Sequence, residues 1–308
     1  PYDRETGRVP GGSSSGAAVS VADGMVAAAL GTDTAGSVRI PASMCGLAGF
    51  KPTRARVPTD GLFPLSTTLD SVGPLAPTVG CCALMDAIFS GEPAIMPEAV
   101  PLDGLRFAVP DTLVTDDLEP EVAASFEHAL QALSGAGVRI TEMAFPELGE
   151  LAHVGRARSP SIVEAYAIHR ERLTDMADLM DPRISKRLLA GAALSGADYY
   201  DILRFREDLI QRANRVTAPF DAVIMPTLPI IAPPIANFMG SEDRLCDPHI
   251  IIIRNTVIAN LLARCALSIP CHEAGTAPVG FTLMGENMAD KRLLGIGLSV
   301  EKILSPNV

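Results

Sequence analysis

Glycine and serine are concentrated in three short stretches between residues 11 and 53, and this segment constrains the fold more than any other part of the chain. The stretches are GGSSSG at 11–16, GTDTAGSVRIPA at 31–42 and GFKPT at 49–53. Glycine permits tight or unusual backbone turns that other residues resist, so we expect closely packed, strained loops here. Ser13 and Ser37 lie in these loops, and the histidine nearest to either of them in sequence is His128. The arrangement indicates serine chemistry that does not use histidine.

The loop that contains Ser37 is suited to holding a negatively charged oxygen. A glycine-containing run such as residues 33–37 can turn several backbone N–H groups toward one point, which stabilises an oxyanion without a charged side chain. A serine inside such a loop is well placed to attack a carbonyl carbon. The alternative interpretation is a pair of Gly-Ser turns that carry no chemistry.

Residues 12–16 also match the pattern G-x-S-x-G, in which Ser14 would be the nucleophile at a sharp strand-to-helix turn. That pattern requires a buried strand just before it, whereas residues 3–10 are polar and include Gly7 and Pro10. It also requires a histidine partner, and nothing marks any of the five histidines. This nucleophile-elbow interpretation is therefore the weaker one.

Apolar and amphipathic segments alternate along the chain, which predicts an α/β fold. A strand at 105–109, an amphipathic helix at 120–133 and a strand at 138–144 are typical of parallel pairing through a helical crossover. We also expect a buried strand at 25–30, a turn at 70–78 and helices over most of 159–220 and over 249–264. Such alternation favours a layered fold around one large mixed sheet.

Composition and charge restrict the functional classes. A chain of 308 residues with 48% hydrophobic residues can bury a large core. Its net charge of −11 would repel a phosphate backbone, so we expect no nucleic-acid partner. The most apolar stretch, residues 250–266, is interrupted by Arg254, Asn260 and Arg264, whereas a membrane-spanning helix needs about 20 mostly apolar residues. We therefore expect no membrane segment.

Residues 11–53 resemble the signature region of the amidase signature family, because GGSSSG, GTDTAGS, VRIPA and GFKPT follow in that family's order and spacing. Later segments at 70–78 (DSVGPLAPT), 220–227 (FDAVIMPT) and 268–285 (SIPC to PVGFTLMG) are similar to its later landmarks. The resemblance implies the amidase-signature α/β fold, with a large mixed β-sheet covered by helices on both faces. Residues 1–308 would then form one domain, the C-terminal two-thirds of the complete fold, with its N-terminal part missing.

The resemblance also implies a Ser–cis-Ser–Lys triad. Ser37 corresponds to the nucleophile, and Ser13, after a cis Gly12–Ser13 peptide bond, corresponds to the serine that relays a proton. The family's oxyanion hole is formed by backbone N–H groups of the loop that corresponds here to Thr34, Ala35, Gly36 and Ser37. Many members have glycine where this chain has Ala35.

Two charged residues, Asp33 and Arg39, flank the nucleophile position. We expect them to form a salt bridge that braces the loop, in preference to a role for Arg39 in binding a substrate carboxylate. No metal ligand set and no organic cofactor is implied by the resemblance.

The family's lysine lies well upstream of the cis-serine, and the first twelve residues of this chain contain no lysine. The chain's lysines are Lys51, Lys186, Lys291 and Lys302. Lys51 belongs to the GFKPT landmark, and the other three are expected in helices, so none stands in the context of the catalytic base. We therefore expect a longer enzyme whose upstream segment carries the lysine, and the activity of residues 1–308 alone stays an open question.

The implied reaction is hydrolysis of a linear carboxamide to a carboxylate and ammonia or an amine, through a seryl acyl-enzyme. One alternative is the A subunit of a glutamyl-tRNA(Gln)/aspartyl-tRNA(Asn) amidotransferase, which needs partner proteins. Another is a non-catalytic homologue that lacks its lysine. We expect a small-molecule amide as partner and a cytoplasmic location, and a homodimer is an open alternative to a single chain.

Overall fold

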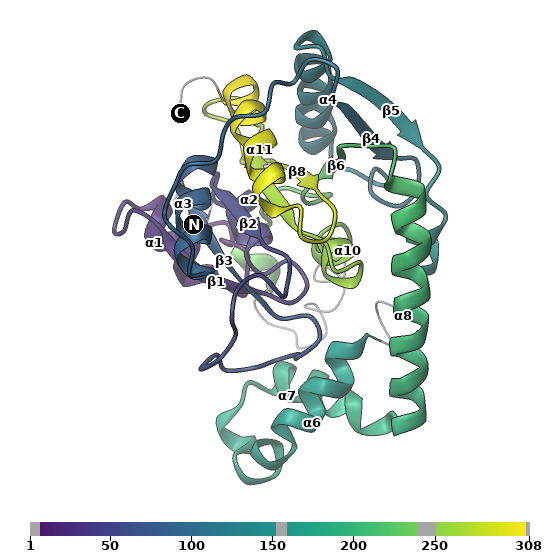
Figure 1. The fold of residues 1–308 in the computed structure, drawn as a ribbon. Coiled ribbons are helices and arrows are strands. Elements are labelled where there is room, and N and C mark those ends of the chain that lie inside the picture. Colours follow the sequence, from purple (N-terminus) through teal and green to yellow (C-terminus); the bar gives the residue numbers. More distant parts are fainter. Residues whose placement is uncertain (1–6, 152–158, 239–250, 306–308) are drawn as a thin grey trace.

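The strands of the computed structural model, which describes residues 7–151, 159–238 and 251–305, form one mixed sheet (Figure 1). In these described residues the strand order is β1-β3-β2-β7-β8-β6-β4-β5. The strands are β1 (Ala29–Asp33), β2 (Ala48–Lys51), β3 (Ser71–Ala76), β4 (Arg106–Pro110), β5 (Arg139–Met143), β6 (Ala222–Pro226), β7 (Ala266–Pro270) and β8 (Gly280–Met284). β4 pairs in parallel with β5 and β6, and the other pairings are antiparallel.

The helices cover both faces of this sheet. They are α1 (Ser15–Ala22), α2 (Arg39–Met44), α3 (Val79–Phe89), α4 (Pro120–Gly135), α6 (Pro160–Asp175), α7 (Pro182–Leu189), α8 (Gly196–Thr217), α10 (Val257–Leu261) and α11 (Asp290–Leu304). Short 3-10 helices lie at Ala177–Leu179, Ala190–Ala193 and Ile235–Phe238. Successive strand residues point to opposite faces, and Phe107 accordingly packs with α3, α4 and α11, whereas Ala108 packs with α8 and α10. The expected two-sided α/β architecture is confirmed.

Helix α8 is the long helix that joins the sheet to the α6–α7 unit (Figure 1). It begins with a capping box, in which the Ser195 hydroxyl accepts from the Asp198 N–H and the Asp198 carboxylate accepts from the Ser195 N–H. Reciprocal caps of this kind satisfy backbone N–H groups that the first helical turn leaves unpaired. Leu209 and Ala213 of α8 are buried in one hydrophobic cluster with residues of the sheet and of α10. Helix α8 therefore packs against both the sheet and α10.

The β-α-β unit at 105–144 matches the expectation, with β4 and β5 in parallel register, Phe107 opposite Ile140. The strand expected at 25–30 is wrong in position, since β1 runs from Ala29 to Asp33. Met25 and Val26 are 70% and 45% exposed. The apolar run suggests burial, but antiparallel pairing with β3 places polar residues up to Asp33 in the strand instead.

The turn expected at 70–78 is also wrong, because residues 71–76 form β3, between β1 and β2. Gly73 and Pro74 suggest a turn, yet both are accommodated inside the sheet. A Cβ at Gly73 would lie 2.0 Å from the Phe50 carbonyl oxygen, so the glycine permits close approach of two strands. The pairs between β2 and β3 are confined to Ala48–Ala76 and Gly49–Leu75, which leaves Pro74 outside that ladder.

The helix expected at 249–264 is shorter than the apolar pattern suggests. Residues 249–250 lie outside the described residues, residues 254–256 form a turn, and α10 begins at Val257. The Asn255 side chain donates to the carbonyl oxygens of Val114 and Pro226, both at 2.9 Å. Such side-chain bonds to distant backbone compete with helical continuation. No helix in the described part of the chain is both long and apolar enough to cross a bilayer.

Candidate active site

Ser37 lies in the loop between β1 and α2 and is half-buried. The Ser14 N–H donates to the Ser37 carbonyl oxygen at 3.2 Å, so the GGSSSG loop lies directly against the Ser37 loop. The Gly12–Ser13 peptide bond is cis, as the resemblance implied, and Ser13 is exposed. The structure thus brings the two serine loops together although 24 positions separate Ser13 from Ser37.

The Ser14 hydroxyl is hydrogen-bonded to the backbone of β1. Its hydroxyl donates to the Thr32 carbonyl oxygen at 3.3 Å, and the Thr32 N–H lies 3.2 Å from the same hydroxyl oxygen. No strand immediately precedes Ser14 in residues 7–13; that segment contributes an isolated bridge between Arg8 and Pro234. The structure therefore disagrees with the nucleophile-elbow interpretation.

The Asp33 carboxylate holds the Ser37 loop by accepting hydrogen bonds from its backbone. Its Oδ1 accepts from the Gly36 N–H at 2.7 Å and its Oδ2 accepts from the Val38 N–H at 3.3 Å. Arg39 donates to both oxygens, from Nε and Nη2, each at 3.0 Å, and this expected ion pair is buried. Burial by itself would raise the pKa of Asp33, but the Arg39 charge and hydrogen bonds hold that pKa below its usual value. The loop is therefore built around an ionised carboxylate.

Gly36 is the position at which this loop requires glycine. Its φ is +124°, and a Cβ there would lie 2.1 Å from Thr256 Oγ1. The Thr256 hydroxyl donates to the Ala35 carbonyl oxygen at 2.7 Å, so the residue that excludes a side chain at Gly36 also anchors the loop. Ala35 is not among the residues with positive φ, which explains why alanine is accepted at a position where the resemblance implied glycine in many relatives.

Three residues of this site were not found by sequence reasoning: Asn260, Asp70 and Glu164. Asn260 Nδ2 donates to the Asp33 carbonyl oxygen at 3.1 Å and to Asp33 Oδ1 at 2.9 Å. Asp70 accepts from the Thr34 hydroxyl at 2.6 Å and from the Ser66 N–H at 2.9 Å. Asp70 opens the DSVGPLAPT landmark and so had a local signal, whereas nothing near Asn260 marked it.

Glu164 on α6 stabilises the segment before β3 by accepting hydrogen bonds from it. Its carboxylate accepts from the Thr68 N–H at 3.0 Å, from the Tyr199 hydroxyl at 2.6 Å, and from the hydroxyls of Ser66 and Thr68. Burial would raise the pKa of Glu164, but these hydrogen bonds lower it overall. Since Asp70 follows this segment and contacts Thr34, the network links α6 and α8 to the Ser37 loop.

Lys51 is the buried member of the four lysines. It lies at the end of β2, is 1% exposed, and donates from Nζ to the Pro52 carbonyl oxygen at 2.7 Å. Burial lowers the pKa of Lys51 to about 8, a shift that Asp33 partly opposes. No hydrogen bond joins Lys51 to Ser13 or Ser37 among the described residues. Lys186, Lys291 and Lys302 are exposed on helices.

The part of the chain that the structure describes contains no set of side chains that could bind a metal ion. Within residues 7–151, 159–238 and 251–305, no group of three or more His, Cys, Asp or Glu side chains could hold a metal ion. The site there consists of serine hydroxyls, backbone N–H groups, and a buried network of carboxylates, amides and guanidinium groups.

The amidase family model matches residues 1–294, and the chain belongs to that family. It is 37% identical over 313 residues to 2-amino-5-chloromuconic acid deaminase of Comamonas testosteroni, covering 99% of this chain and 66% of that protein. It is 33% identical to indoleacetamide hydrolase of Rhizobium radiobacter, over 96% of this chain and 67% of that protein. It is 31% identical to the A subunit of glutamyl-tRNA(Gln) amidotransferase of Thermotoga maritima, over 98% of this chain and 69% of that protein.

Solved structures show the same relationship. A crystal structure of an amidase superposes with a TM-score of 0.87 at 32% identity, covering 97% of this chain and 68% of that chain. The A subunit of the Thermotoga maritima amidotransferase superposes with a TM-score of 0.81 at 29% identity, covering 100% of this chain and 69% of that chain. The chain spans about two thirds of the length of the relatives it matches.

Proposed function

We propose that this protein is an amidohydrolase that cleaves the C–N bond of a small linear carboxamide through a seryl acyl-enzyme on Ser37. The observation that carries the proposal is the Asp33-centred loop, which holds Ser37 in a fixed, half-buried position beside the Ser13 loop. The names of the family's hydrolase and deaminase members support the same class of reaction. A fixed nucleophile next to backbone N–H groups is the arrangement that acyl transfer requires.

In the proposed reaction Ser37 Oγ attacks the amide carbonyl carbon, and its proton passes to Ser13. A general base is needed because a serine hydroxyl is a weak nucleophile at neutral pH. We propose a lysine in this role, as the family resemblance implies, and Lys51 is not assigned to it. The proton returns to the leaving amine, and water then hydrolyses the ester between the acyl group and Ser37.

The oxyanion would be held by backbone N–H groups of the loop that follows β1. The Gly36 N–H already donates to Asp33 Oδ1 at 2.7 Å. We therefore propose that the N–H groups of Thr34, Ala35 and Ser37 contact the oxyanion, and that Gly36 shapes the loop. Asp33 and Arg39 would brace the loop, and neither would touch the substrate.

The test is hydrolysis of a panel of small primary amides by the full-length protein. Ser37→Ala should abolish turnover, and Ser13→Ala should lower the rate by about 10²–10⁴-fold if it relays a proton. Ser134→Ala, on the exposed face of α4, is the matched serine control and should retain full activity. Turnover by the Ser37→Ala variant would overturn the assignment. Loss of activity on treatment with EDTA would instead indicate a metal-dependent mechanism.

A second candidate is the A subunit of an amidotransferase, favoured by 31% identity and by the TM-score of 0.81 to the Thermotoga maritima protein. In that case Ser37 would release ammonia from glutamine only with partner proteins present. Hydrolysis of simple amides by the protein without partners would reject this candidate. Failure of the full-length protein to react with any serine-directed reagent would favour a non-catalytic homologue.

A further inference from the structure

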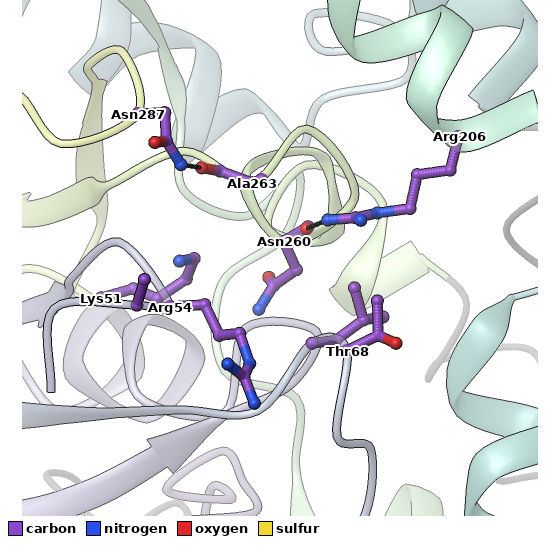
Figure 2. Close-up of a pocket in the computed structure, with 9 residues that line it drawn as sticks. Lys51, Arg54, Thr68, Arg206, Asn260, Ala263 and Asn287 are labelled. Carbon is purple, nitrogen blue, oxygen red and sulfur yellow. Dashed lines mark hydrogen bonds between the residues drawn. The ribbon is translucent and has the colours of Figure 1, made fainter. Parts of the chain in front are cut away.

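A cavity of about 210 Å³ lies between the end of β2, α8 and α10. Figure 2 shows Arg206 reaching toward it from α8, with Lys51 and Arg54 on the opposite side and Asn260 between them. Three of the lining residues are cationic and none is a carboxylate. Neither serine of the proposed active site lines this cavity, so its charge calls for a separate explanation.

Arg54 is the exposed cation of the three. Its guanidinium forms no ion pair and no hydrogen bond with any of the described residues. An arginine presents five N–H donors in a planar fork that matches the two oxygens of a carboxylate. Arg54 therefore supplies unused donors at the mouth of the cavity.

Arg206 and Lys51 supply buried donors. Arg206 Nη2 donates to the Asn260 carbonyl oxygen at 3.2 Å, but its buried Nε has no partner in the described structure. Lys51 Nζ has three protons, and its one observed acceptor is the Pro52 carbonyl oxygen. Burial lowers the pKa of Arg206 and of Lys51, and the charges of nearby carboxylates only partly oppose this effect.

Three carboxylates act electrostatically on Lys51 or Arg206, and each of them accepts hydrogen bonds from other groups. Asp33 is paired with Arg39. Glu164, whose charge acts on Arg206, accepts hydrogen bonds from Thr68 and Tyr199. Asp290, whose charge acts on Lys51, accepts from the Thr53 N–H through Oδ1 at 2.7 Å, and its buried Oδ2 has no partner among the described residues. A buried or half-buried cation without a partner is costly, and a bound anion would compensate it.

We propose that this cavity binds the carboxylate group of a small organic acid through Arg54, Arg206 and Lys51. A cavity needs about 10–15 Å³ of probe-occupied space to hold one water molecule, so this cavity has room for several waters or a small ligand. Pockets for drug-sized ligands begin at about 300 Å³. The ligand is therefore an acid of a few carbon atoms, and succinate is a suitable probe.

Asn260 connects this cavity to the Ser37 loop, because it lines the cavity and also donates to Asp33. The carboxylate has two sources that the experiment below distinguishes: part of the substrate, or a separate small acid. The binding proposal holds for either source and does not rest on the proposed amidase activity.

The experiment is isothermal titration of the full-length protein with succinate, with neutral butanediamide as the matched ligand. The wild-type protein should bind succinate and not butanediamide. Arg54→Gln should weaken binding by about tenfold or more, since a charge-assisted hydrogen bond is lost. Lys302→Gln removes the same charge from the exposed face of α11 and should leave the affinity unchanged. Arg206→Gln, checked for folding by circular dichroism, should weaken binding as Arg54→Gln does.

Absence of succinate binding by the wild-type protein would overturn the proposal. Equal loss in Arg54→Gln and Lys302→Gln would overturn it as well, because it would reveal a response to net charge alone. The rate of butanamide hydrolysis, measured with and without succinate, then distinguishes the two sources of the carboxylate. Competitive inhibition by succinate would assign the carboxylate to the substrate, and inhibition or activation without competition would assign it to a separate ligand. Absence of any amide hydrolysis would count against the proposed function while the titration still decides this proposal.

Discussion

Asn260 donates from its side-chain Nδ2 to both the carbonyl oxygen and Oδ1 of Asp33, which lies 227 positions earlier in the chain. Arg39 completes the cluster by donating from Nη2 to Asn260 Oδ1 at 2.7 Å. All three side chains are buried. The conformation of the Ser37 loop therefore depends on α10, and a substitution in this cluster should change the position of Ser37.

The buried ion pair gives the first prediction. Arg39→Met leaves the buried Asp33 carboxylate with N–H donors from Gly36, Val38 and Asn260 but without its ion-pair partner. The free energy of unfolding, measured by urea denaturation, should therefore fall by about 3–5 kcal/mol. The matched control is Arg292→Met, which breaks an exposed pair with Asp221 and should cost about 1 kcal/mol or less. Equal losses in the two variants would contradict the role assigned to Asp33 and Arg39.

Gly36 gives the second prediction. Gly36→Ala places a Cβ against the Thr256 side chain at a φ of +124°, so stability should fall by about 2 kcal/mol or more and amide hydrolysis should be lost. The control is Gly16→Ala in α1, where a Cβ would meet nothing within 4 Å and alanine favours the helix by up to about 1 kcal/mol. Thermal unfolding and activity assays compare the pair, and an active, stable Gly36→Ala variant would refute the role given to this glycine.

Lys51 gives the third prediction, on pH. Its pKa is about 8 in the folded protein against an ordinary value of 10.5, so between these values the unfolded chain binds more protons. Stability contributed by this group therefore rises with pH in that window. From about pH 7 to about pH 9.5, the wild-type protein should gain about 2 kcal/mol relative to Lys51→Met. Urea denaturation at both values measures the difference, and no change would show that Lys51 keeps its ordinary pKa.

Local signals are sufficient to predict part of this fold. Helix α4 is predictable because its amphipathic pattern is bounded by Pro120 and by glycines that end it. The β-α-β unit follows from that helix and its flanking apolar strands. The motif indicates the position of Ser37, and the charge pattern around it indicates the Asp33–Arg39 pair. These features depend on residues close together in sequence.

The rest depends on distant contacts. A turn is wrongly predicted at β3 because Gly73 is typical of a turn, whereas here it permits close approach to Phe50. The apolar pattern predicts too long a helix at α10, because Asn255 bonds to the backbone of Val114 and Pro226, which no local pattern reveals. Asn260 is a polar residue in an apolar run, and its partner Asp33 lies near the other end of the chain. Sequence reasoning therefore locates the Ser37 loop and the Asp33–Arg39 pair, but not the contacts from α10 that hold this pair in place.

The most direct test of the central claim is labelling of the full-length protein with a fluorophosphonate, followed by peptide mapping. We expect one modified serine, Ser37, and no labelling of the Ser37→Ala variant. Ser14, whose hydroxyl is hydrogen-bonded to Thr32, should stay unmodified. Labelling of Ser14 in place of Ser37, or of no serine at all, would contradict the assignment of Ser37 as the nucleophile.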